Sequence, residues 1–196
     1  MKSRNLVLIV IVVFILILGG CAGCGYNNMV KLDENVKQSW NNVQSDYQRR
    51  ADLIPNLVST VKGAANFETT TLTQVIEARA KATSVNINAE NLTPDKVQQF
   101  QQAQGQLSGA LSKLLVVAEQ YPQLQATQSF RDLQVQLEGT ENRIKVSRND
   151  FNNTVQTYNT TVRRFPNNIF AGMFGFSVKQ GFTADAGSEK APKVAF

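Results

Sequence analysis

Two long stripes of apolar residues, repeating at alternate intervals of three and four positions, restrict this chain to a helical fold. Such alternation keeps one face of a helix turned toward a neighbour over many turns. Each stripe therefore predicts a helix of about 40 residues. The first stripe is Val36, Trp40, Val43, Tyr47, Arg50, Ile54, Leu57 and Val61. The second is Phe130, Leu133, Leu137, Thr140, Ile144, Arg148, Phe151, Val155, Tyr158, Val162 and Phe165.

Two shorter helices are predicted between these stripes. Residues 67–83 repeat with a helical period. Thr93, Pro94 and Asp95 form a helix start, because a hydroxyl cap, an early proline and an acid all favour the first turn. That third helix is predicted to end near Glu119. No stretch alternates apolar and polar residues as a half-buried strand would. The predicted fold class is all-α, an antiparallel up-down four-helix bundle with long first and fourth helices, preceded by an N-terminal membrane-anchoring segment.

The first 24 residues have the pattern of an export signal or a membrane anchor. Lys2 and Arg4 precede an apolar run over residues 6–18, which ends in Leu-Gly-Gly-Cys at Cys21. Two alternatives remain open: cleavage with lipid attachment at Cys21, or an uncleaved helix, since a membrane span needs about 20 apolar residues. A released protein is the third reading. Basic residues stay in the cytoplasm, so both anchored readings predict a domain outside it.

Two local features predict breaks in helical geometry. Gly19, Gly20, Gly23 and Gly25 crowd together after the apolar run, and glycine is costly inside a helix, so a hinge is predicted there. Pro55 removes a backbone donor within the first stripe, which predicts a kink near residues 51–52.

The residue types available restrict the chemistry. The chain has 2 cysteines, Cys21 and Cys24, and no histidine, so no Ser-His or Cys-His arrangement exists and a four-ligand zinc site has no support. The net charge is +5, but basic and acidic residues are interleaved, which is typical of solvated helix faces and not of nucleic-acid binding. The sequence therefore predicts neither an enzyme nor a bound cofactor or metal.

A charged layer is predicted inside the bundle. If Tyr26 and Phe165 lie at one level of antiparallel helices, Arg50 lies level with Glu141, and Glu138 is one turn away. A charge on an apolar stripe is costly unless it is paired, so Arg50, Glu138 and Glu141 predict a structural ion-pair layer. A carboxylate metal site is the weaker alternative, since such sites add histidines.

The segment after Pro166 is predicted to return to the membrane-proximal end, because an even number of alternating helices ends where it began. Five apolar residues gather there and either cap the core or meet the bilayer or a membrane-embedded partner. They are Ile169, Phe170, Met173, Phe174 and Phe176. The rest, residues 177–196, is polar and predicted to be a mobile tail.

Several motifs in order resemble the LemA family. They are Tyr26-Asn27 with Met29-Val30, RRADLIPNLVSTVKG at 49–63, TLTQVIEARAKA at 71–82, QLEGTENRI at 136–144, YNTTVRRFP at 158–166 and FGF at 174–176. The resemblance covers nearly all of the chain after the leader, with the bundle at 26–176. It implies a membrane-anchored bundle of antiparallel helices with no established enzymatic activity and no known cofactor. The Leu-Gly-Gly-Cys signal departs from the plain anchor segment of the family.

Two functions follow as hypotheses. The first is a tethered interaction or scaffold module whose partners are the membrane and an envelope protein. The second is an envelope ligand-binding module or enzyme that uses an acidic-basic site in the bundle core.

Overall fold

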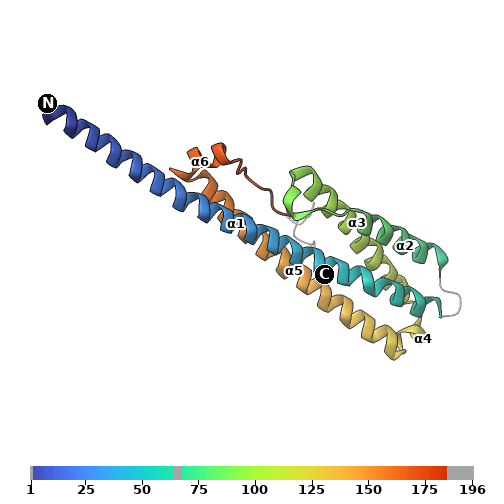
Figure 1. Cartoon of the computed structure of the whole chain (residues 1–196). Coiled ribbons are helices and arrows are strands. Elements are labelled where there is room, and N and C mark those ends of the chain that lie inside the picture. Colours follow the sequence, from blue (N-terminus) through green and yellow to red (C-terminus); the bar gives the residue numbers. More distant parts are fainter. Residues whose placement is uncertain (1, 64–67, 185–196) are drawn as a thin grey trace, which may run out of the picture.

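The computed structural model describes residues 2–63 and 68–184, without the side chains of residues 2–7, 10–12 and 14–22. Every regular element in these ranges is helical, which confirms the all-α prediction (Figure 1). The long helices are α1 (Lys2–Lys62), α2 (Thr69–Ser84), α3 (Pro94–Ala118) and α5 (Gln128–Arg163). The short elements are the 3-10 turn η1 (Ala89–Asn91), α4 (Pro122–Gln125) and α6 (Asn167–Phe174). The short elements were not predicted.

The long helices pack as two pairs, α1 with α5 and α2 with α3, and the α2–α3 pair lies against the α1–α5 pair (Figure 1). The core between them consists of two apolar clusters. One holds Trp40, Phe100 and Phe151 and lies nearer the N-terminal part of α1. The other holds Ile54, Leu107 and neighbours toward α4. The predicted stripes therefore supply most of the buried residues of α1 and α5.

The glycine-rich segment does not form the predicted hinge. Helix α1 continues through residues 19–25 without interruption, so that prediction was wrong. Each glycine costs a helix only about 0.5–1 kcal/mol, which is too little to break a helix that continues on both sides. At Gly25 the absence of a side chain has a packing reason: an added Cβ would lie 2.8 Å from Asn167 Oδ1, at the start of α6.

Residues 177–184 lie against α5 and belong to the bundle, so the predicted boundary of a mobile tail at residue 177 was wrong. We call this segment the strap. Asn159 Nδ2 donates to the Lys179 carbonyl over 2.7 Å, and Asn159 Oδ1 accepts from the Lys179 amide over 2.8 Å. Asn152 binds both backbone groups of Phe182 in the same way, over 3.1 and 2.8 Å. Residues 185–196, the rest of the predicted tail, lie outside the described residues.

The two asparagine contacts match in spacing. Asn152 and Asn159 are two helical turns apart, about 10.5 Å along α5, and three extended residues from Lys179 to Phe182 span about 10 Å. Phe182 is buried, with its ring 5.8 Å from Trp40, 5.6 Å from Phe151 and 6.5 Å from Phe100, measured between ring centres. The strap therefore completes the aromatic core.

Gly181 is a position where the strap tolerates no side chain. An added Cβ would lie 2.5 Å from Asn152 Oδ1, the atom that accepts the Phe182 amide. We expect Gly181→Ala to lower the free energy of unfolding by about 1–2 kcal/mol. The matched control is Gly109→Ala, an exposed helical site with no atom within 4 Å of the new Cβ, which should gain about 0.5–1 kcal/mol. Urea unfolding followed by circular dichroism measures the change in the free energy of unfolding for both variants. If Gly181→Ala stabilised the protein as Gly109→Ala does, the tight fit at Gly181 would be contradicted.

Candidate functional site

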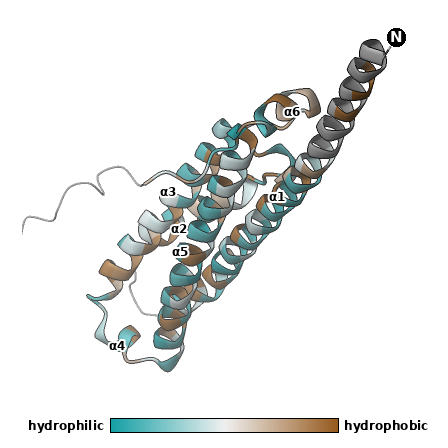
Figure 2. Ribbon diagram, turned by 90° about the vertical axis from the view of Figure 1, so that its left-hand side faces the viewer, coloured by the Kyte–Doolittle hydropathy of each residue, from teal (hydrophilic) through white to brown (hydrophobic). Residues whose placement is uncertain are grey.

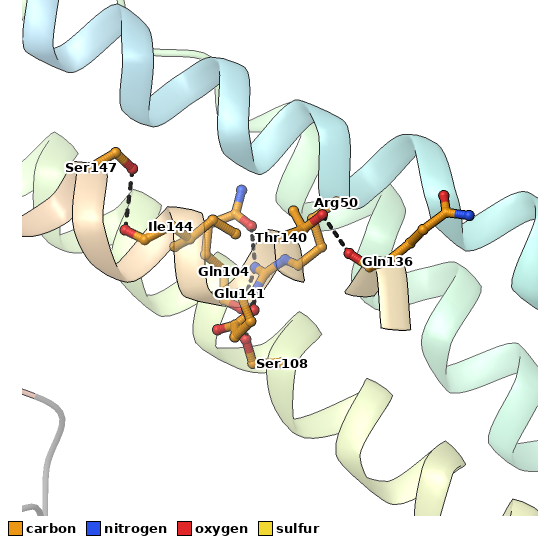
Figure 3. Close-up of polar contacts among 8 residues, drawn as sticks. All are labelled: Arg50, Gln104, Ser108, Gln136, Thr140, Glu141, Ile144 and Ser147. Carbon is orange, nitrogen blue, oxygen red and sulfur yellow. Dashed lines mark hydrogen bonds and ion pairs between the residues drawn. The ribbon is translucent and has the colours of Figure 1, made fainter. Parts of the chain in front are cut away.

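The most distinctive cluster inside the bundle surrounds Arg50 of α1, whose residue surface is only 1% exposed (Figure 3). Its Nη1 donates to Glu141 Oε2 over 2.9 Å and to Ser108 Oγ over 2.7 Å. Its Nη2 donates to Gln104 Oε1 over 2.8 Å and to the Gln104 carbonyl over 3.3 Å. The Tyr47 ring lies 5.0 Å from the guanidinium carbon. We call Arg50, Gln104, Ser108 and Glu141 the polar layer.

The polar layer separates the two apolar clusters. On α1 the first cluster ends at Tyr47 and the second begins at Ile54, with Arg50 between them. On α5 the corresponding gap lies between Leu137 and Ile144. Gln104 Nε2 also donates to the Ala82 carbonyl over 3.4 Å, so the layer joins α1, α2, α3 and α5. The buried hydroxyls of Thr140 and Ser147 bind carbonyls of their own helix, as Figure 3 shows.

The structure brings Arg50 and Glu141 together but leaves Glu138 outside the layer. Glu138 is exposed and accepts a hydrogen bond from Gln134 Nε2 over 3.4 Å. The Glu141 side chain is 57% exposed, so the layer opens to solvent on one side, beside a cavity of about 210 Å³. In the described residues, Nε of Arg50 has no hydrogen-bond partner. Both terminal nitrogens are bound by protein oxygens, which fits a structural role.

Arg79 of α2 has a role that the sequence reasoning missed. Pro55 has no N–H, so it cannot donate to the carbonyl of Ala51, four residues earlier in α1. Arg79 Nε donates to that carbonyl instead, over 2.8 Å. Helix α1 continues through Pro55 as a result. The sequence did hold a signal for this contact. A proline inside an apolar stripe leaves one backbone carbonyl without its helical donor, so a donor from another helix is expected.

The five apolar residues after Pro166 divide into two groups. Phe170 and Phe176 are half-buried and pack against the aromatic core. Ile169, Met173 and Phe174 are exposed, with exposed fractions of 54%, 74% and 50%. The capping interpretation therefore accounts for the first group, whereas Ile169 and Met173 face outward and the Phe174 ring packs against Tyr26 of α1.

A surface cleft of about 1000 Å³ lies between α5 and the strap, and Arg163, Arg164 and Lys179 are among its lining residues. Lys179 Nζ forms an ion pair with Asp33 Oδ1 over 2.9 Å and lies 5.3 Å from the centre of the Tyr158 ring. Burial, with a smaller contribution from the charge of Asp33, raises the pKa of Tyr158 to about 12. The phenol therefore stays neutral at physiological pH.

The backbone of residues 2–24, the export-signal segment, belongs to α1, but the Cys21 side chain lies outside the described residues. The same holds for most of the apolar run, where only Leu8, Ile9 and Val13 have described side chains. Among the described residues, no helix is apolar over a stretch long enough to cross a membrane. Likewise, no group of three or more potential metal ligands occurs among the described side chains.

These features define an all-helical bundle protein whose buried charge is satisfied by its own side chains. A sequence model of the LemA family matches residues 39–196. The chain therefore belongs to the LemA family, as the motif resemblance predicted.

Curated relatives are distant. Magnetosome protein MamQ 2 of Paramagnetospirillum magneticum is 25% identical over an alignment covering 80% of this chain and 64% of the relative. Magnetosome protein MamQ of Magnetospirillum gryphiswaldense is 25% identical, covering 77% of this chain and 62% of the relative. Protein LemA of Metamycoplasma hominis is 24% identical, covering 75% and 64%. The chain thus spans less than two thirds of each of these relatives.

Proposed function

We propose that this protein is a membrane-anchored helical bundle that acts outside the cytoplasm as an interaction or scaffold module of the envelope. The observation that carries the proposal is the continuity of α1. Its 61 residues form one helix, about 90 Å long, that begins in the basic and apolar leader and ends in the bundle core. An uncleaved anchor over residues 6–24 would therefore hold the bundle at a fixed height and orientation above the bilayer.

The polar layer supports an interaction role over a catalytic one. The terminal nitrogens of Arg50 are bound by Glu141, Ser108 and Gln104, so they already have partners within the protein. The two apolar clusters on either side are filled by large side chains. A bundle of this kind offers partners its outer helix faces.

The anchor is tested in the native host with the full chain. We expect the protein to sediment with membranes and to resist a high-salt wash. Uptake of a supplied fatty acid by wild type and Cys24→Ser, but not by Cys21→Ser, would identify a lipid anchor at Cys21 with the preceding residues removed. Membrane retention without label in wild type would identify an uncleaved helix as the anchor. Recovery of wild type in the soluble fraction would contradict anchoring.

The interaction role is tested by photo-crosslinking in the same membranes. Single photoreactive residues replace Val116 of α3, Val135 of α5 and Val146 of α5, all exposed positions. A scaffold should give a discrete adduct from the surface of one helix, α3 or α5, and none from the other. Native mass measurement of the purified chain is the counter-test, since a retained metal or small molecule would favour the ligand-binding alternative.

A further inference from the structure

Helix α6 lies across α1 instead of running along it. Its first residue, Asn167, meets Gly25, and its last, Phe174, has its ring centre 4.9 Å from that of Tyr26. An eight-residue helix is about 12 Å long, so a parallel packing would place its ends about seven or eight residues apart on α1. The two contacts fall on neighbouring residues instead. If α1 crosses a bilayer, α6 therefore lies roughly parallel to the bilayer surface.

The outward face of α6 is apolar. Ile169 and Met173 of α6 are 54% and 74% exposed, and Phe165, which precedes the helix, is 75% exposed. Ala171 is buried and Phe170 half-buried on the inner side. Figure 2 shows this hydrophobic helix at the end of the bundle away from α4. Clustered large apolar side chains on a surface usually mark an interface.

The charge around this face is one-sided. Residues 163–184 contain Arg163, Arg164 and Lys179 and no acidic residue. On α1, residues 19–30 contain no charged residue. The nearest acid on α1 is Asp33, which pairs with Lys37 over 3.3 Å and with Lys179 over 2.9 Å. Arg163 and Arg164 are exposed, so the net field here attracts an anionic surface.

The position of α6 matches the depth of a headgroup layer. A helix needs about 20 residues to cross the hydrocarbon core, so a span that begins at Leu6 reaches the edge of the core near Gly25. Headgroup layers are about 5–8 Å thick on each side of the hydrocarbon core. Side chains extend about 5–6 Å from a helix axis, so Ile169 and Met173 would reach into that layer. Amphipathic helices bind bilayers at this depth.

We propose that Phe165 and the outward face of α6 form a membrane-docking surface for an anionic phospholipid bilayer. The exposed apolar side chains enter the headgroup region, and the guanidinium groups of Arg163 and Arg164 bind lipid phosphates. This inference rests on the proposed anchoring, because the anchor places α6 at the bilayer. It adds a second contact that fixes the tilt and rotation of the bundle.

The test uses the full chain in vesicles whose phospholipid tails carry bromine, which quenches tryptophan fluorescence on contact. Met173→Trp places a reporter on α6, and Val135→Trp places a matched exposed reporter on α5 far from it. Wild-type emission from buried Trp40 is subtracted. With about 30% anionic lipid, we expect roughly twofold quenching at position 173 and almost none at position 135. Adding Arg163→Gln with Arg164→Gln should reduce the quenching at position 173.

Vesicle flotation separates the two proposals. Protein that does not float with vesicles would contradict the anchoring itself. Protein that floats while position 173 remains as unquenched as position 135 would overturn the docking surface and leave the anchor intact. Emission at position 173 that changes with protein density, and not with bromination, would also overturn it and identify a second copy as the occupant. Unchanged circular dichroism checks that Met173→Trp folds.

Discussion

Arg50→Ala should lower the free energy of unfolding by about 3–5 kcal/mol, because it removes a fully buried side chain and leaves Gln104 and Ser108 without their donor. For a chain of this size, that loss corresponds to a fall of roughly 6–20 °C in the melting temperature. Urea unfolding and thermal melting of the full chain in detergent, followed by circular dichroism, measure the effect.

Three control variants sharpen this prediction. Arg49→Ala removes an exposed arginine next in sequence and should cost less than about 0.5 kcal/mol. Glu141→Gln should cost about 1.5–3 kcal/mol, because the buried Arg50 loses its counter-charge but keeps Gln104 and Ser108 as partners. Arg50→Met should cost less than Arg50→Ala, because apolar side chains of similar size often replace buried ion pairs. Similar losses for Arg50→Ala and Arg49→Ala would show that the layer does not stabilise the bundle.

The helices and part of the polar layer could be predicted from the sequence. Stripes spaced by three and four positions predict α1 and α5, because burial of one face follows from helical periodicity. Counting residues along antiparallel helices places Arg50 level with Glu141, and these side chains are 2.9 Å apart. Gln104 and Ser108 were not predicted, because the register of α3 against α1 depends on loops whose geometry the sequence pattern does not encode.

The remaining differences have a common cause in tertiary contacts. The glycines at 19–25 predict a hinge because glycine has a low helix propensity. Helix α1 nevertheless continues through them, because the helical residues on both sides extend the helix and α6 packs on Gly25. The strap has the composition of a tail, and side chains of the bundle, among them Asn152 and Asn159 of α5 and Gln101 of α3, hold its backbone in place. Single asparagines that bind a distant backbone leave no periodic signal in the sequence.

The strap leads to the second large expected effect. Phe182→Ala should lower the free energy of unfolding by about 3–5 kcal/mol, the usual cost of truncating a buried phenylalanine. Phe182 packs among Trp40, Phe100 and Phe151, and the guanidinium carbon of Arg148 lies 4.8 Å from its ring centre. Its removal would open a cavity in the middle of the aromatic core. Thermal melting of the full chain measures the loss.

Trp40 gives this prediction a local readout. The Phe182 ring is stacked on Trp40 at an angle of 21°, and the indole Nε1 donates to the Ile87 carbonyl over 3.1 Å. Loss of the covering ring should admit water and shift the Trp40 emission to longer wavelength. Val178→Ala, at an exposed position of the same strap, is the control and should change neither stability nor emission. If Phe182→Ala also leaves stability and Trp40 emission unchanged, the strap does not cover the core in solution. The aromatic residues of α1, α3 and α5 would then be shielded from water without Phe182.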